Sequence, residues 1–534
     1  MKSILIALIL MVSITAKSQE IALTVSKKYL NLPISTKTER AKMSFTFNGK
    51  PILNFNIRLA TGEPDYWVFY DLSKYKGQTL EINYTGNPSG LKKVYQDERI
   101  AGQDSMYKEV NRPQIHFSTR RGWINDPNGM IYLDGEYHLF YQHNPYETDW
   151  ENMHWGHAIS KDLVHWKELP TALFPDSIGT MFSGSALVDH KNTSGFGKDG
   201  IAPMVAVYTA PPVQCLAYSL DKGQTFTKYK ENPVLKGRGD RDPHVFWYEP
   251  GKHWVMSLYE NSGMAIYTSK DLKQWNYESQ TSGFYECPQF FELPIDGNKS
   301  NKKWVLYGAS GVYMIGTFNG KAFTPESGKY RYINGNVYAA QTFANIPNSD
   351  GRRIQMGWGQ ITHPGMPFKG MMTLPTELTL RSTNDGIRLF SYPVKEIDAL
   401  QEKEYCWENI DPKKGTEFLQ QFNNAAALRI KLTLKITHPD KVKLSLNGQE
   451  IFSYFLSWSK VNDQFYFPND ITSKEITADI IIDKTSAEVF IDGGAYSFVL
   501  QRDVNSKNKT GFQFSPEWCE IKSLKVYPMK SIWE

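Results

Sequence analysis

A repeated unit constrains the fold of this 534-residue chain more than any other feature. Three times, an acidic residue at a proline-containing corner is followed by a short apolar run, a turn and a second apolar run. The units begin at Asn125-Asp126-Pro127-Asn128-Gly129, Arg241-Asp242-Pro243 and Glu286-Cys287-Pro288. Because equivalent positions of a radial repeat point to the same place, we expect Asp126, Asp242 and Glu286 to converge on one axis.

A second element recurs between the acidic units. A Ser-x-Asp triplet followed by an aromatic residue occurs at 160–162, 219–221 and 269–271, so its aspartates at 162, 221 and 271 are 59 and 50 residues apart. This spacing is close to the roughly 40–50 residues of a four-stranded propeller blade. A β-sandwich is the competing architecture, but nothing in it repeats at this period. We therefore expect a five-bladed propeller over residues 108–398.

Short strand-like runs outside this region predict two further β domains. Residues 19–107 contain no acidic unit and are expected to form a small N-terminal β domain, whose role the sequence does not indicate. Residues 399–534 alternate like strands and contain the hairpin turn Asp492-Gly493-Gly494, which predicts a C-terminal β-sandwich. The predicted fold class is all-β: a five-bladed β-propeller followed by a C-terminal β-sandwich, with an additional small N-terminal β domain.

The first 18 residues and the charge balance indicate a secreted protein. Residues 1–18 have a positive start at Lys2 and a short apolar run from Ile4 to Ala16, as in a signal peptide. The prediction is export to the periplasm or the medium, with no stable membrane insertion after cleavage; an uncleaved anchor is the alternative. With 60 basic and 56 acidic residues and no basic run, nucleic acid is not an expected partner.

The four cysteines do not form a disulfide framework in so long a chain. Cys406 and Cys519 both fall in the last domain, where they either pair after export or stay as free thiols. The aromatic content of 14% suits stacking on sugars, but aromatic side chains also fill β cores.

Three converging carboxylates match the needs of glycoside hydrolysis. One carboxylate attacks the anomeric carbon or activates water, a second protonates the leaving oxygen, and a third group can hold sugar hydroxyls. We expect Arg241 to keep the neighbouring Asp242 ionised by charge pairing, and Glu286 to be the better candidate for the acid. Each motif alone is typical of a tight turn or a surface ion pair. The combination favours a functional site, because turns selected only for backbone shape need not all include an acidic residue.

These motifs resemble the signatures of the glycoside hydrolase family 32 β-fructosidases, which include invertases, inulinases and levanases. The resemblance is carried by Trp123 to Gly129, Arg241-Asp242-Pro243 and Glu286-Cys287, and it covers roughly residues 111–400. It implies a five-bladed propeller joined to a sandwich, in agreement with the repeats. It also implies that Asp126 is the nucleophile, that Glu286 acts as acid and then base, and that Asp242 binds fructose hydroxyls and stabilises the transition state.

The resemblance further implies a pocket and a retaining mechanism, with the two reacting carboxyls about 5–5.5 Å apart. The residues expected to bind the substrate are Asn125, Gln142, Trp150, Phe182, Ser183, Arg241, Tyr338 and Trp358. No metal and no cofactor is expected. The histidines His143, His154 and His157 are expected to be pocket or core residues rather than metal ligands.

Substrate and mode of action stay open among several hypotheses. Ile333 and Gln341, on either side of Tyr338, stand where many sucrose-cleaving relatives have Asp and Lys, which favours fructans. The leading hypothesis is a secreted, exo-acting hydrolase that releases fructose from levan, inulin or fructo-oligosaccharides. An endo-levanase, a sucrose-cleaving invertase and a fructosyl transferase would use the same carboxylates. The alternative from another class is a carbohydrate-binding protein with a catalytically weak site.

Overall fold

The computed structural model describes residues 19–236, 240–436, 441–455, 460–461, 464–465, 475–515 and 519–533. The predicted signal peptide at residues 1–18 lies outside the described residues. The chain divides into two compact units, Met1–Asp104 and Ser105–Glu534. Within the described ranges, no helix is both long and apolar enough to cross a membrane.

The first unit consists of two antiparallel sheets that face each other. Their orders are β1-β6-β3-β4 and β5-β2-β7. The strands are β1 Gln19–Thr24, β2 Tyr29–Ile34, β3 Ala41–Phe47, β4 Lys50–Ile57, β5 Tyr66–Asp71, β6 Thr79–Tyr84 and β7 Tyr95–Asp97. Phe45 of β3 meets Tyr70 of β5 with ring centroids 5.2 Å apart, and both rings are buried. Alternate side chains of both sheets thus share one core.

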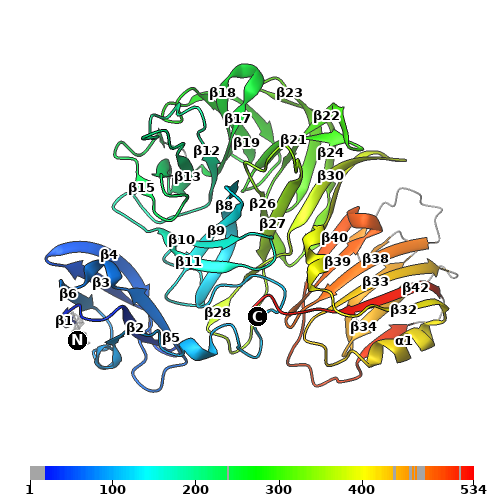
Figure 1. The fold of residues 1–534 in the computed structure, drawn as a ribbon, viewed down its shortest axis with the longest axis horizontal. Coiled ribbons are helices and arrows are strands. Elements are labelled where there is room, and N and C mark those ends of the chain that lie inside the picture. Colours follow the sequence, from blue (N-terminus) through cyan, green and yellow to red (C-terminus); the bar gives the residue numbers. More distant parts are fainter. Residues whose placement is uncertain are drawn as a thin grey trace, which may run out of the picture. The chain divides into compact units, whose positions relative to one another are not determined.

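In the second unit, five blades surround a common centre and form the propeller, with blades IV and V joined in one nine-stranded sheet (Figure 1). Blade I has β8 Gly122–Leu133, β9 Glu136–Asn144, β10 His154–Ser160 and β11 Lys167–Leu173; blade II has β12 Gly184–Val188, β13 Met204–Ala210, β14 Val213–Ser219, β15 Thr227–Lys228 and β16 Leu235–Lys236. Blade III has β17 Arg241–Tyr248, β18 His253–Glu260, β19 Gly263–Ser269 and β20 Asn276–Ser282; blade IV has β21 Gln289–Ile295, β22 Asn298–Tyr307, β23 Val312–Phe318 and β24 Phe323–Arg331. Blade V has β26 Val337–Thr342, β27 Arg353–Gly359, β30 Thr376–Thr383 and β31 Gly386–Pro393. The predicted propeller is confirmed.

The Ser-x-Asp repeat marks the connection from the third to the fourth strand in blades I to III. The serine hydroxyl donates to the aspartate at 3.0 Å for Ser160 and Asp162, at 2.7 Å in the 219–221 copy and at 3.2 Å in the 269–271 copy. Asp162 also accepts from the backbone N–H groups of Val164 and His165. Such side-chain contacts stabilise a tight turn, so the triplet recurs wherever the blade needs this turn.

Two of the acidic units differ from the expected corner-then-strand arrangement. Asp126 lies inside β8 and Asp242 lies inside β17, where the strand pairing shifts register between Ile124 and Pro127 and between Arg241 and His244. A β-bulge turns a side chain out of the regular alternation of a strand. The acids are therefore directed by bulges within the first strands of blades I and III, while Glu286 precedes β21.

Short parallel pairings join neighbouring blades and link the propeller to the C-terminal domain. The two residues of β28 (Phe368–Lys369) pair in parallel with the start of β8, between blades V and I. A single parallel pair, Ile295 with Leu380, connects blades IV and V. The strand β25 (Ile333–Gly335) leaves the propeller and pairs in parallel with β40 (Tyr496–Gln501) of the C-terminal domain.

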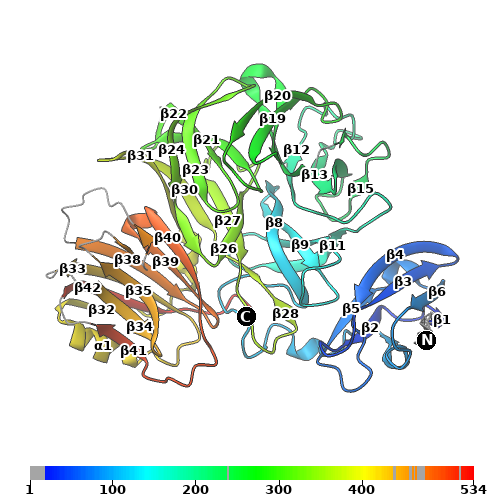
Figure 2. The ribbon, with the colours of Figure 1, turned by 180° about the vertical axis from the view of Figure 1, so that it is seen from behind.

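The C-terminal domain is a sandwich of two sheets, seen from behind in Figure 2. Their orders are β25-β40-β39-β38-β33-β42-β32 and β37-β36-β35-β34-β41. The remaining elements are β29 Met371–Met372, the 3₁₀ helix η5 Lys395–Leu400, β32 Tyr405–Ile410, α1 Pro412–Gln420, β33 Leu428–Ile436, β34 Lys441–Leu446, β35 Gln449–Phe455, β36 Lys460–Val461, β37 Gln464–Phe465, β38 Glu475–Ile482, β39 Ser486–Ile491, β41 Phe512–Ser515 and β42 Cys519–Pro528. The strand β25 lies before residue 398 in the chain but belongs to a sheet of the sandwich. The predicted domain boundary at residue 398 therefore stays a proposal. Cys406 is an exposed free thiol and Cys519 a buried one.

A buried ionic cluster connects the propeller to the sandwich. The His116 ring lies 2.7 Å from Asp483 Oδ2 and 3.1 Å from Glu488 Oε1, with all three side chains almost fully buried. Burial alone would lower the pKa of His116, but the two carboxylates raise it to about 9. Glu488 also accepts from the backbone N–H of Leu374, so it contacts blade V as well.

Candidate active site

One cavity of about 200 Å³ opens among the inner strands of the propeller. It is lined by Asn125, Asp126, Gln142, Trp150, Phe182, Ser183, Arg241, Asp242, Glu286, Tyr338 and Trp358. These are the catalytic and substrate-binding residues predicted from the sequence, and the structure brings all of them together. The predicted convergence of the three carboxylates is thus observed, whereas their chemical roles stay predictions.

The lining comes from all five blades or the segments between them. Strands β8, β9, β17, β26 and β27 contribute Asn125, Asp126, Gln142, Arg241, Asp242, Tyr338 and Trp358. Trp150 lies in the β9–β10 connection, Phe182 and Ser183 lie just before β12, and Glu286 lies just before β21. A ring of strands therefore supplies the walls, and three connections supply the remaining groups.

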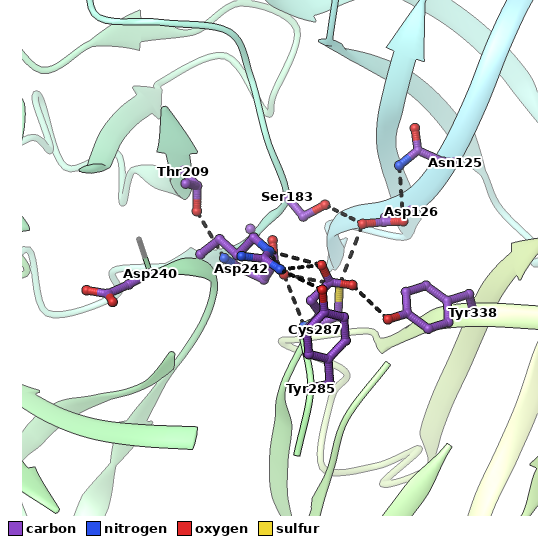
Figure 3. A network of polar contacts seen from close by, with 12 residues as sticks. Asn125, Asp126, Ser183, Thr209, Asp240, Asp242, Tyr285, Cys287 and Tyr338 are labelled. Carbon is purple, nitrogen blue, oxygen red and sulfur yellow. Dashed lines mark hydrogen bonds and ion pairs between the residues drawn. The ribbon is translucent and has the colours of Figure 1, made fainter. Parts of the chain in front are cut away.

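Asp126 is held by hydrogen bonds at both carboxylate oxygens (Figure 3). Ser183 Oγ donates to Oδ2 at 2.7 Å, and Asn125 Nδ2 donates to Oδ1 at 3.1 Å. The Cys287 thiol lies 3.5 Å from the same Oδ2. Burial raises the pKa of Asp126, and the contacts with Ser183, Asn125 and Cys287 oppose that rise because they favour the charged form. The carboxylate is fixed in orientation and faces the cavity.

Asp242 is the most deeply buried of the three acids, with 6% of its surface exposed. Its Oδ2 accepts from the backbone N–H of Cys287 at 3.2 Å, and its own N–H donates to Thr209 Oγ1 at 3.0 Å. Burial, followed by the nearby charge of Asp126, raises its pKa to about 7. Asp242 is therefore harder to ionise than a carboxyl exposed to water.

The expectation that Arg241 keeps Asp242 ionised is wrong. Arg241 Nε lies 3.9 Å from Asp242 Oδ2, but its hydrogen bonds go to Glu286 Oε1, at 3.0 Å from Nε and 2.6 Å from NH2. The bulge in β17 and the left-handed backbone at Asp242 break the regular alternation of the strand and direct the guanidinium to Glu286. The weak remaining attraction does not outweigh burial and the charge of Asp126.

Glu286 is held from two sides. Arg241 binds Oε1, and the Tyr338 hydroxyl donates to Oε2 at 2.7 Å (Figure 3). A phenol hydroxyl both donates and accepts. Tyr338 can therefore donate to an ionised Oε2 and accept from a protonated one, so the contact persists in both protonation states.

The backbone around two of the acids adopts a conformation that non-glycine residues rarely take. Asp242, Glu286 and Cys287 have φ angles of 65°, 49° and 43°. Each such residue costs about 1–2 kcal/mol relative to ordinary backbone and persists only where surrounding contacts hold it. The N–H of Ala309 supplies one such contact, since it binds the carbonyl oxygens of Tyr285 and Glu286 at 3.2 and 3.0 Å.

Aromatic rings form the remaining walls. Trp150 is 51% exposed and packs edge-on against Phe182, with ring centroids 5.8 Å apart. Trp358 packs edge-on against Trp123 at 5.6 Å. Among the residues that the structure describes, no acceptor pairs with the buried Trp358 Nε1.

Several residues considered from the sequence lie outside the cavity. His143, His154 and His157 are buried in blade I and belong to its core. Ile333 packs in a hydrophobic core with Val499, and Gln341 donates to the carbonyl of Gly184. Ile333 and Gln341 therefore carry no information about the sugar in the pocket, and the preference expected from them has no structural basis. In the described part of the chain, no group of three or more His, Cys, Asp or Glu side chains could hold a metal.

Three contributors to the site were missed from the sequence. Thr209 and Cys287 position Asp242, and Tyr285 bonds to Arg241. Cys287 and Tyr285 flank Glu286 in the third acidic unit, so their place beside the predicted acid was an available signal. Thr209 lies in β13, outside every motif, and no signal in the sequence pointed to it.

Comparison with protein families supports the interpretation of the motifs. The model of the glycosyl hydrolases family 32 N-terminal domain matches residues 116–393. A second model, "Domain of unknown function (DUF4980)", matches residues 17–107.

Individual proteins with similar sequences and structures are fructan-cleaving enzymes by name. A levanase of Bacillus subtilis is 37% identical over 491 residues, which is 81% of this chain and 72% of the levanase. An extracellular exo-inulinase of Aspergillus niger is 36% identical over 363 residues, 56% of this chain and 67% of that protein. The crystal structure of an exo-inulinase from Aspergillus awamori superposes with a TM-score of 0.68 at 26% identity and covers 80% of this chain and 100% of its own.

Proposed function

The chain belongs to glycosyl hydrolase family 32, and from this premise we propose that it hydrolyses the β-D-fructofuranosyl bonds of fructans with retention of configuration. Asp126 is the nucleophile, Glu286 is the general acid and then the general base, and Asp242 binds fructose hydroxyls. The observation that carries this proposal is the single cavity that all three carboxylates line.

In the first step, an Asp126 oxygen attacks the anomeric carbon of the fructosyl unit. The bond to the leaving oxygen breaks as Glu286 gives that oxygen its proton, so a fructosyl ester of Asp126 and a shortened chain result. The hydrogen bonds from Ser183 and Asn125 orient the attacking carboxylate. In the second step, Glu286 takes a proton from water, the water oxygen bonds to the anomeric carbon, and the ester bond breaks.

Glu286 has to carry a proton in one step and accept one in the next. Its Oε1 is occupied by two donors of Arg241, so Oε2 is the oxygen that exchanges the proton. Tyr338 contacts Oε2 at 2.7 Å and can follow the change by reversing its hydrogen bond. The acid keeps its place throughout the cycle.

The size of the cavity supports exo-action. Pockets for drug-sized ligands measure roughly 300–1,000 Å³, and this cavity of about 200 Å³ is suited to one sugar ring. An endo-acting enzyme has to pass a chain through the site on both sides. We therefore propose release of single fructose units from levan, inulin or fructo-oligosaccharides.

We also propose that the protein is exported. Residues 1–18 resemble a signal peptide, and the similar exo-inulinase of Aspergillus niger is extracellular by name.

Product analysis on three substrates tests the proposal. The protein is incubated separately with levan, inulin and sucrose, and the products are separated by size from the first minutes onward. Fructose as the only early product from a fructan supports the proposal, whereas a ladder of intermediate lengths contradicts exo-action. Longer products than the substrate would indicate transfer to sugar instead of hydrolysis.

Nucleophile and acid variants test the roles and the stereochemistry together. Asp126→Ala and Glu286→Ala should each lower kcat by about 10³-fold or more without loss of fold. With azide added, the Asp126 variant should give fructosyl azide of inverted configuration and the Glu286 variant the retained one, because azide replaces the nucleophile in one case and water in the other. Near-normal activity in either variant would refute the assignment.

A further inference from the structure

Tyr285 is an exposed aromatic residue directly beside the proposed acid. It precedes Glu286 in the chain and is 53% exposed, although it lies outside the cavity lining. A half-exposed aromatic ring beside an active site is available for contact with a bound sugar.

The ring of Tyr285 is held in place from one side. Arg241 NH2 donates to its hydroxyl at 3.2 Å and to Glu286 Oε1 at 2.6 Å, so one nitrogen joins the phenol to the acid (Figure 3). The buried Tyr259 packs edge-on against it, with ring centroids 5.0 Å apart at 70°. Its carbonyl oxygen is bound by the N–H of Ala309. The ring is thus fixed by the protein and still open to solvent.

The position of the acid defines where the leaving sugar has to be. Glu286 gives its proton to the oxygen between the fructosyl unit and the rest of the substrate, so that remainder begins at Glu286 and extends away from Asp126. The cavity accommodates the fructosyl unit, and Tyr285, which is not part of the cavity lining, is joined to the acid through the Arg241 guanidinium. A fixed aromatic face at this place suits the apolar face of a sugar ring.

From this arrangement we propose that Tyr285 forms a stacking platform for the leaving sugar of the substrate and sets the preference for substrates with a carbohydrate leaving group. This inference rests on the proposed function and adds the binding site for the second sugar. Tyr285 takes no part in bond breaking. It acts as a specificity-determining residue, since it improves binding only when a second ring is present.

Two substrates that share the fructosyl unit test this proposal. The trisaccharide 1-kestose has a disaccharide leaving group, whereas methyl β-D-fructofuranoside loses only methanol, which is too small to cover a ring. Tyr285→Ala should lower kcat/KM for 1-kestose by about 10-fold and for the methyl fructoside by less than about 2-fold. Tyr285→Phe keeps the ring and should stay within about 2-fold of the wild type on both. Tyr277→Ala, which removes another tyrosine that is 56% exposed but lies on β20, should leave both rates unchanged.

The pattern of losses separates this role from the alternatives. Equal losses on both substrates in Tyr285→Ala would overturn the proposal, because the ring would then act only through Arg241 and Glu286. Unchanged rates on 1-kestose would overturn it as well. A wild-type protein that cleaves neither substrate would refute the proposed function itself. If the wild type cleaves both and Tyr285→Ala loses no more activity on 1-kestose than on the methyl fructoside, only the role of Tyr285 is refuted.

Discussion

Replacement of Asp242 by asparagine is expected to abolish turnover and to stabilise the folded protein at alkaline pH. The carboxyl group is buried, and burial together with the charge of Asp126 raises its pKa from 3.8 to about 7. Above pH 7 the folded protein therefore carries a buried negative charge beside another carboxylate. A neutral amide of the same size removes this charge. It can still accept from the N–H of Cys287, which now binds Oδ2.

The magnitude follows from the shift in pKa. A rise from 3.8 to about 7 corresponds to about 4 kcal/mol between the charged and the neutral group. The asparagine N–H₂ group replaces an oxygen, and an imperfect partner costs about 1–2 kcal/mol. We expect a net gain of about 2–3 kcal/mol in the free energy of unfolding at pH 8. Because the folded pKa is raised, the wild type loses stability as the pH rises from about 4 through 7, and the variant does not.

Urea denaturation at pH 4, 6 and 8, followed by tryptophan fluorescence, measures this difference. At pH 4, where the folded carboxyl is neutral, the variant should be about 1 kcal/mol less stable than the wild type because of the amide, and at pH 8 it should be the more stable protein. Asp162→Asn is the matched control, since Asp162 accepts hydrogen bonds from Val164 and His165 and, despite partial burial, its pKa is lowered. That variant should be less stable than the wild type at pH 8. An Asp242→Asn protein no more stable than wild type at pH 8 would refute the reasoning.

Three further outcomes are expected. Ser183→Ala removes the 2.7 Å hydrogen bond that lowers the pKa of Asp126, so kcat/KM should fall by about 10-fold and the acidic limb of its pH profile should move to higher pH; an unmoved limb would contradict this. Tyr338→Phe removes the hydroxyl from Glu286 Oε2 and should lower kcat by about 10-fold on 1-kestose and methyl β-D-fructofuranoside alike, in contrast to Tyr285→Ala, and selectivity between them would argue against it. His116→Gln leaves a buried carboxylate without its cation and should cost about 3 kcal/mol in urea unfolding at pH 7. That loss should shrink as the pH rises through about 9, where wild-type His116 itself loses its proton.

The repeats in the sequence predicted most of the fold. The Ser-x-Asp triplets predicted blades because the same hydrogen-bonded turn has to be built in blades I to III. The alternation of residues 399–534 predicted the strands of the sandwich. Alternation does not reveal β2, because this strand is nearly buried along its whole length, and β25 is too short to show a pattern, with only three residues.

The site was predictable as a set of residues but not as a set of contacts. The repeat predicted that Asp126, Asp242 and Glu286 converge, and the family resemblance supplied the other residues of the cavity lining. The partner of Arg241 could not be predicted from adjacency, because the left-handed turn at Asp242 and the bulge in β17 direct the guanidinium to Glu286, 45 residues away. Ile333 misled for the same reason: proximity to Tyr338 in the chain does not place a side chain in the same cavity.

The three residues of β25 limit how this enzyme can be cut and recombined. They come from the catalytic ring, add an edge to the sheet of the last domain through β40, and lead directly into the strand that carries Tyr338. In a hybrid joined after blade V, β25 would pair with a strand from another protein in place of β40. A poor fit there would loosen Tyr338, which contacts Glu286. The propeller and the sandwich should therefore be exchanged together, and hybrids that keep the β25–β40 pairing should retain turnover.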